Sequence, residues 1–262
     1  MVDLGPILSD LAAESQSLDS VVADPAVDWR IPTPAEGWTI AHQIAHLAWT
    51  DAKALIAVRT PDEFGDELKR ALVAGEHYVD DGAAAGADKP RDELLADWRA
   101  GRADLAAALA EAPPGEKFPW YGPPMSAASM LSARLMETWA HGQDVFDALG
   151  LEREPTNRLR HVVRIGVRTR DFAFSVNSLA PPAEEFRVEL RAPGGELWTF
   201  GPEEAAQRVT GTALDFCLLV TQRRHRDDTR LVAEGPDATE WLGIAQAFAG
   251  PPGPGRKAGQ FG

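Results

Sequence analysis

The chain has 262 residues, 44% of them hydrophobic, and a formal net charge of −14. This apolar content is enough to bury a core and excludes an intrinsically disordered chain. The acidic balance, with a pI near 4.8, disfavours nucleic acid and anionic membrane surfaces as partners, because both repel a polyanion. No stretch approaches the roughly 20 consecutive apolar residues that a membrane span needs. Acidic residues near the N-terminus stand where a signal peptide carries basic ones, so we expect a cytoplasmic protein.

The only cysteine is Cys217, which lies in the apolar run LDFCLLV. A lone cysteine rules out a disulfide within the chain. The apolar surroundings predict a buried core residue and not a nucleophile.

The first 150 residues have the periodicity of a helical bundle. The predicted helices cover about residues 3–22, 39–58, 62–80, 91–112 and 126–149. Thr39 is a good N-cap for the second of these, and Gly150 is a typical residue for ending the last. The segment DDGAAAGADKP is predicted to be a turn or loop from its glycine and proline content. Four long helices and a shorter one suit an antiparallel bundle.

The sequence changes character after about residue 150. A helix is predicted over 155–179, and the segments FRVEL and ELWTF, separated by RAPGG, are typical of a β-hairpin. Further helices are predicted at about 203–208, 212–223 and 237–248. The fold class is therefore α+β, with a helical bundle over 1–150, a smaller α/β domain over 151–250, and a Pro/Gly-rich tail over 251–262.

Two of the bundle helices carry pairs of metal-ligand residues one turn apart. The first pair is His42 and His46, in HQIAH, and the second is Glu137 and His141, in ETWAH. Residues at i and i+4 lie on one face of a helix, so one pair can bind a single ion and a facing helix can supply a third ligand. Three protein ligands leave a coordination position open, as a catalytic metal site requires.

Each pair taken alone also has an ordinary interpretation, as packing, helix capping or a solvated ion pair. The flanking segments AHLAW and METWAHGQDVFDAL are apolar, which predicts that Glu137 and His141 point inward. Burying a carboxylate without a partner is costly, so two inward-facing pairs favour a metal site. The spacing alone leaves both His42 and His46 as candidates, although His42 falls in the first helical turn and can bond there instead.

The segments GWTIAHQIAHLAW and RLMETWAHGQDVFDALG resemble the DinB-like, mycothiol-dependent maleylpyruvate isomerase superfamily. The resemblance extends along nearly the whole chain and implies a four-helix metal-binding domain followed by a smaller α/β domain. It implies that the metal ligands are His46, Glu137 and His141, and so selects His46 over His42. The end of the chain is similar to an actinobacterial subgroup described as metal-binding proteins.

Other residues carry weaker signals. Trp120 and Tyr121, in FPWYGPPMS, precede the Glu137 helix and either line the mouth of the site, as substrate-binding residues, or pack the loop. Arg223 and Arg224 follow an apolar helix, where cationic side chains complement the helix dipole. The alternative is a catalytic role as an anion clamp for a substrate carboxylate, which the resemblance to the isomerases favours.

These observations predict a metal-dependent enzyme that uses a low-molecular-weight thiol, with mycothiol as the cosubstrate. The expected reaction is thiol transfer to an electrophilic small molecule, or its isomerisation, in a cleft between the bundle and the second domain. Zinc suits two imidazoles and a carboxylate best, with nickel, iron and manganese as alternatives. A metal-dependent hydrolase and a non-catalytic metal-binding or ligand-binding protein are the rival interpretations.

Overall fold

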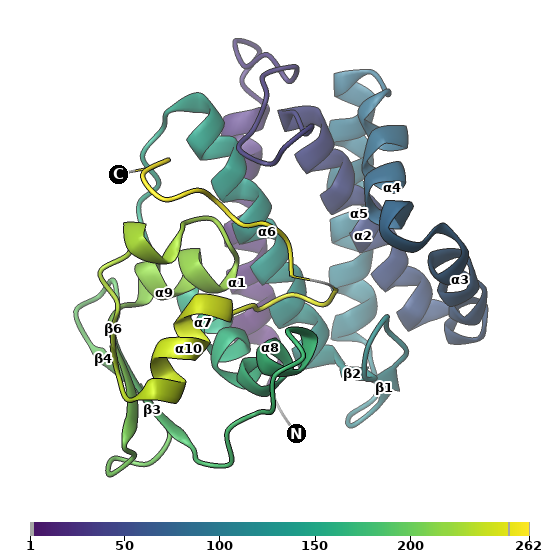
Figure 1. The fold of residues 1–262 in the computed structure, drawn as a ribbon. Coiled ribbons are helices and arrows are strands. Elements are labelled where there is room, and N and C mark those ends of the chain that lie inside the picture. The colour runs from purple at the N-terminus through teal and green to yellow at the C-terminus, as the bar shows by residue number, and fades with distance from the viewer. Residues whose placement is uncertain (1–2, 251, 262) are drawn as a thin grey trace. The chain divides into compact units, whose positions relative to one another are not determined.

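The computed structural model describes residues 3–250 and 252–261 of the chain. It divides into two compact units, Met1–Glu152 and Arg153–Gly262, whose elements are labelled in Figure 1. Among the described residues, no helix is long and apolar enough to cross a membrane. The first unit is almost entirely helical and the second combines helices with a sheet, so the predicted α+β class is confirmed.

The first unit is built on four long helices with a shorter pair beside them. The long helices are α1 (Gly5–Val22), α2 (Ile40–Arg59), α5 (Arg91–Ala110) and α6 (Ala127–Leu149). The connection between α2 and α5 contains α3 (Pro61–Ala74), the short 3₁₀ helix η1 (Gly75–His77) and α4 (Tyr78–Ala87). Helix α2 is central, because it contacts α3, α4, α5 and α6, while α1 packs against α6 (Figure 1).

The sequence sets the ends of the two helices that carry the ligand pairs. Thr39 caps α2 through a reciprocal capping box with His42, which satisfies backbone N–H groups that the first turn leaves unpaired. Ser126 caps α6 by accepting a hydrogen bond from the Ser129 backbone N–H. Gly150 ends α6 in the left-handed conformation at φ 63°, where a side chain would be strained. These caps determine where α2 and α6 begin and where α6 ends.

Two apolar clusters hold the bundle together. The larger one contains Leu18, Ile44 and Trp98, which are fully buried between α1, α2 and α5. The other lies at the opposite end of α2 and includes Leu105 and Met130. Helical spacing of apolar side chains on each long helix produces these clusters, so burial of apolar area is the main stabilising term.

The predicted loop over residues 80–90 is wrong for most of its length, because α4 continues to Ala87. Its two glycines are helical and pack directly on α2. A Cβ at Gly82 would lie 2.6 Å from the Trp49 ring, and one at Gly86 would lie 2.8 Å from the Ala45 Cβ. Glycine here permits close helix approach and does not mark a turn, so packing overrides the local signal.

A short β-hairpin connects α5 to α6. Its strands are β1 (Lys117–Phe118) and β2 (Met125–Ser126), which pair antiparallel. The hairpin was not predicted. It presents Trp120 and Tyr121 in the loop between its strands.

The second unit contains a four-stranded sheet in the order β4-β3-β5-β6. Its strands are β3 (Phe186–Arg191), β4 (Leu197–Phe200), β5 (Gln207–Thr212) and β6 (Val232–Glu234). Its helices are α7 (Leu159–Arg168), α8 (Arg170–Val176), α9 (Ala213–Val220), the 3₁₀ helix η2 (Arg226–Asp228) and α10 (Pro236–Ile244). The predicted hairpin is confirmed as β3 and β4, which are antiparallel, whereas β3 and β5 are parallel.

Two helix predictions in this unit are wrong. The helix expected at 203–208 is replaced by a turn and the start of β5, because Gln207 and the following residues pair with β3, far back in the chain. The helix expected over 155–179 begins only at Leu159 and is interrupted at Thr169, whose hydroxyl donates to the Gln246 carbonyl at 2.6 Å. The first difference comes from a strand pairing that local sequence does not contain.

Cys217 is fully buried in α9, as predicted for a core residue. Burial raises the pKa of its thiol well above the usual value, so little thiolate forms at neutral pH.

Candidate metal centre

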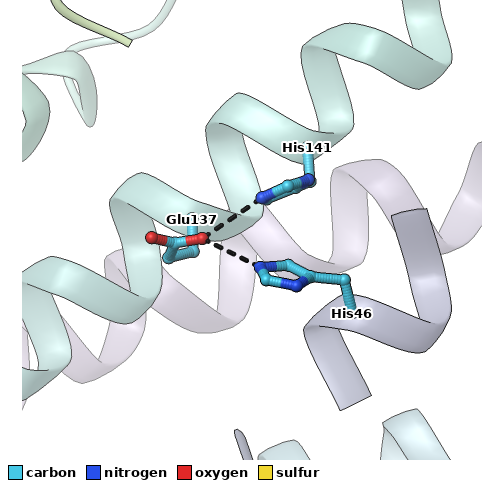
Figure 2. Close-up of side chains that lie close together, drawn as sticks. All are labelled: His46, Glu137 and His141. Carbon is cyan, nitrogen blue, oxygen red and sulfur yellow. Dashed lines mark hydrogen bonds and ion pairs between the residues drawn. The ribbon is translucent and has the colours of Figure 1, made fainter. Parts of the chain in front are cut away.

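Three side chains from two neighbouring helices converge on one point of the first unit. His46 projects from α2, and Glu137 and His141 project from successive turns of α6 (Figure 2). One ligand atom from each residue lies within 4.8 Å of the other two. Within the described residues, this is the group of histidine, cysteine and carboxylate side chains that has metal-binding spacing.

The distances fit a common ion. Glu137 Oε2 lies 3.4 Å from His46 Nε2 and 3.2 Å from His141 Nε2. Two ligand atoms that are each about 2.1 Å from a zinc ion, at a tetrahedral angle, are separated by about 3.4 Å. Both distances from the carboxylate are therefore those expected for ligands of a common divalent cation.

The hydrogen bond at His141 Nδ1 leaves its Nε2 available to bind a metal ion. Its Nδ1 lies 2.6 Å from the Oε1 of Gln43. An amide oxygen can only accept a hydrogen bond, so this contact places a proton on Nδ1. In a neutral imidazole the Nε2 atom then carries a lone pair, and that lone pair faces the Glu137 carboxylate. Either a proton on Nε2 or a metal ion between the two atoms satisfies both of them at 3.2 Å.

The electrostatics keep Glu137 ionised. Burial raises the pKa of this carboxyl, but contacts with His141 and His46 and the charge of Arg134 lower it well below its usual value. Arg134 lies one turn earlier on α6 and is itself buried, bonded to Asp51 at 3.0 Å and to the Thr50 hydroxyl at 2.9 Å. The ligand carboxylate is therefore in its metal-binding form at neutral pH.

His42 lies outside the cluster. Its Nδ1 accepts the Thr39 backbone N–H at 3.3 Å and lies 2.9 Å from the Thr39 hydroxyl. The imidazole is therefore part of the helix cap, the alternative that its place in the first turn had left open.

Aromatic rings that sequence analysis missed surround the two imidazoles. The Trp38 ring centre lies 5.4 Å from that of His46 and 5.9 Å from that of His141. The Trp49 ring lies 6.2 Å from His46, on the same helix. The i+3 spacing of Trp49 from His46 was a usable signal, whereas Trp38 precedes the helix and gave none.

Trp120 and Tyr121 have different surroundings. Trp120 stacks on Phe64 at 5.7 Å between ring centres, which is a loop-packing contact. The Tyr121 hydroxyl lies 3.0 Å from that of Tyr78, whose ring packs edge-on against Trp49 at 5.0 Å. A continuous series of aromatic contacts thus connects Tyr121 to the ring beside His46.

Arg223 and Arg224 lie in the second unit, just after α9. Both backbone N–H groups donate to the Leu218 carbonyl. The Arg223 guanidinium donates to the Thr221 carbonyl at 2.6 Å, and that of Arg224 lies 4.0 Å from the centre of the Phe261 ring. The candidate ligands His46, Glu137 and His141 all lie in the first unit.

The fold is a helical bundle that carries a candidate His₂Glu centre, followed by a small α/β unit, and comparisons with known proteins identify its family. The family model described as mycothiol maleylpyruvate isomerase N-terminal domain matches residues 11–146. The chain belongs to this mycothiol maleylpyruvate isomerase family, which confirms the family suggested by the two helical motifs. A second model, described as wyosine base formation, matches residues 182–234.

Two full-length relatives come from Mycobacterium tuberculosis. They are uncharacterized protein MT0041 of strain CDC 1551 / Oshkosh and uncharacterized protein Rv0036c of strain ATCC 25618 / H37Rv. Each is 57% identical over 257 residues, spanning 98% of this chain and 100% of the relative.

Two solved structures share the fold. One is a crystal structure of the mycothiol-dependent maleylpyruvate isomerase, with a TM-score of 0.57 and 18% identity. The other is a mutant of a mycothiol-dependent maleylpyruvate isomerase, with the same TM-score and 19% identity. Each comparison covers 90% of this chain and 96% of the other chain.

Proposed function

We propose that this protein is a cytoplasmic, metal-dependent enzyme that uses a low-molecular-weight thiol, mycothiol, to transfer the thiol to an electrophilic small molecule or to isomerise it. The observation that carries the proposal is the convergence of His46, Glu137 and His141, with ligand atoms 3.2 and 3.4 Å apart. Membership of the mycothiol maleylpyruvate isomerase family supports the choice of thiol.

The charge and softness of the three ligands favour a thiolate as the next group bound. Two neutral imidazoles and one carboxylate leave a divalent ion with a net charge of about +1, which attracts an anion. Zinc suits this ligand set best, and nickel, iron and manganese are the alternatives. Zinc in this position would lower the pKa of a bound thiol, so that thiolate is available at neutral pH.

The residues around the cluster would shape the space next to the ion. Trp38 and Trp49 pack against the His46 imidazole and would form one wall of that space. We propose Tyr121, with Trp120 beside it, as substrate-binding residues at the far end of the aromatic series.

The experiment that tests the proposal has two parts. The purified protein is analysed for metals, and its turnover of activated alkenes, epoxides and halides is then measured with and without mycothiol. We expect about one divalent ion per chain and turnover that requires the thiol. Equal rates in both conditions would reject the thiol mechanism and favour a metal-dependent hydrolase. Metal without any turnover would favour a non-catalytic binding protein.

We further propose that Arg223 or Arg224 binds a substrate carboxylate. Replacing the responsible arginine with alanine should cost turnover roughly 1.5–3 kcal/mol, the scale of a charge-assisted hydrogen bond. The metal content should stay unchanged. Loss of metal in both Arg223→Ala and Arg224→Ala would instead assign these residues to support of the fold.

A further inference from the structure

We propose that Gln43 is a positioning residue that fixes His141 in the tautomer able to bind the metal. The inference rests on the metal centre of the proposed function. Gln43 is a polar side chain with no exposed surface, and it lies on α2, opposite the ligand that it contacts on α6.

The orientation of the Gln43 amide is set by a directional series of hydrogen bonds. The Thr33 hydroxyl donates to the Trp38 carbonyl at 2.9 Å, which uses its only proton. Thr33 must therefore accept from Gln43, whose Nε2 donates to it at 2.9 Å. With the amide nitrogen directed to Thr33, the amide oxygen faces His141 Nδ1 at 2.6 Å.

The segment that holds Gln43 is itself fixed. The Thr33 backbone N–H also donates to the Trp38 carbonyl, at 2.7 Å, and Pro32 forms an isolated bridge with Thr39 at the start of α2. The same segment places the Trp38 ring against both imidazoles. One loop therefore supplies both the wall of the site and the anchor for its positioning residue.

His46 provides the contrast within the same site. Its Nδ1 is buried without a hydrogen-bond partner among the described residues. The protein thus fixes the tautomer of one imidazole ligand and leaves the other to be set by the ion. A partner on the remote nitrogen of a metal-binding histidine orients the ring and raises its basicity, and losing such a partner costs about 10–100-fold in affinity.

Two variants distinguish a role of Gln43 in fixing the His141 tautomer from a role in packing alone. Gln43→Met keeps the length of the side chain but removes the acceptor, so His141 should populate both tautomers. Gln43→Glu keeps an acceptor for the His141 proton and should recover most of the loss. The probes are ¹⁵N NMR of the metal-free protein, with His141→Ala to assign the signals, and zinc affinity measured by competition with a chromophoric chelator.

We expect an Nδ1–H tautomer in the wild-type protein, loss of that preference in Gln43→Met, and zinc binding about 10–100-fold weaker in this variant. If Gln43→Met does not fold, Thr33→Val replaces it, because it removes the group that orients the amide and should shift the tautomer in the same direction. An Nε2–H tautomer in the wild type, or zinc affinity in Gln43→Met within about twofold of wild type, overturns the inference.

The same data distinguish this failure from failure of the proposed function. If the zinc affinity of His141→Ala equals that of the wild type, the metal centre itself is wrong and the positioning role fails with it. If zinc affinity depends on His141 but not on Gln43, only the positioning role is wrong.

Discussion

Two glutamates of the bundle, the buried Glu67 and the partly buried Glu137, have different surroundings. Glu67, on α3, accepts hydrogen bonds or ion pairs from Lys53 at 2.7 Å, Arg70 at 2.5 Å and the Tyr78 hydroxyl at 2.8 Å. Glu137, on α6, faces two imidazole nitrogens, and that of His141 presents a lone pair when the ring is neutral. The first carboxylate is surrounded by a lysine, an arginine and a hydroxyl, and the second faces two imidazoles whose nitrogens can also bind a metal ion.

We interpret the difference as that between a structural ion pair and a candidate metal ligand. A buried carboxylate needs compensation for the lost hydration, and Glu67 receives it from two cations and a hydroxyl. Arg134 is the cation nearest to Glu137 in sequence. Its guanidinium forms an ion pair with Asp51. We propose that a metal ion completes the surroundings of Glu137.

The largest expected effect is on metal affinity. His46→Ala, Glu137→Ala and His141→Ala each remove a ligand and should weaken zinc binding by more than the ~100-fold upper cost of losing an outer partner. His42→Ala and Glu67→Gln should bind zinc like the wild type, since neither residue belongs to the cluster. Equilibrium dialysis with elemental analysis measures all five variants, and full occupancy in His46→Ala would refute the ligand assignment.

The next effect concerns stability in acid. Burial raises the pKa of Glu67, but hydrogen bonds from Lys53, Tyr78 and Arg70 outweigh it and lower the pKa to about 2, from 4.5 for an unperturbed carboxyl. The folded state therefore favours the ionised form. The stabilisation that ionised Glu67 gives the folded state is fully present above about pH 5. It is lost as the pH falls toward 2, which lowers the free energy of unfolding by roughly 2–3 kcal/mol.

Urea unfolding between pH 3 and 7 measures this dependence. Glu67→Gln should reduce the slope of stability against pH, while Glu76→Gln, at an exposed position of η1, should leave it unchanged. The same slope in Glu67→Gln and wild type would show that Glu67 is not held as an ion.

The smallest effect completes the comparison. In the metal-free protein at pH 8, Glu137→Gln replaces an acceptor with an amide that can donate to an imidazole lone pair. Stability should change by less than about 1 kcal/mol, whereas Glu67→Gln should lose about 1–3 kcal/mol because it removes an acceptor from Lys53 and Tyr78. Equal losses in the two variants would mean that Glu137 is also a structural partner.

The candidate ligands were predictable because helical periodicity is local. His46, Glu137 and His141 stand on long helices with clear caps, and the i, i+4 spacing of the last two places them on one face. The structure brings the same three residues together. The resemblance to a family was still needed at the sequence level to choose His46 over His42.

The features that were missed depend on contacts between distant segments. Gly82 and Gly86 were taken for loop residues, but they allow α4 to pack closely on α2. The helix expected at 203–208 gives way to β5 because β3 pairs with it in parallel. Gln43 gave no signal, because its role depends on His141, which is 98 residues away.

The central claim is that His46, Glu137 and His141 bind one divalent ion. The most direct test is anomalous diffraction at the zinc edge from crystals of the zinc-loaded protein. The account predicts a single strong peak between the two Nε2 atoms and the Glu137 carboxylate, at about 2.0–2.2 Å from each ligand atom. A peak elsewhere, or none at this position with zinc in excess, would contradict it.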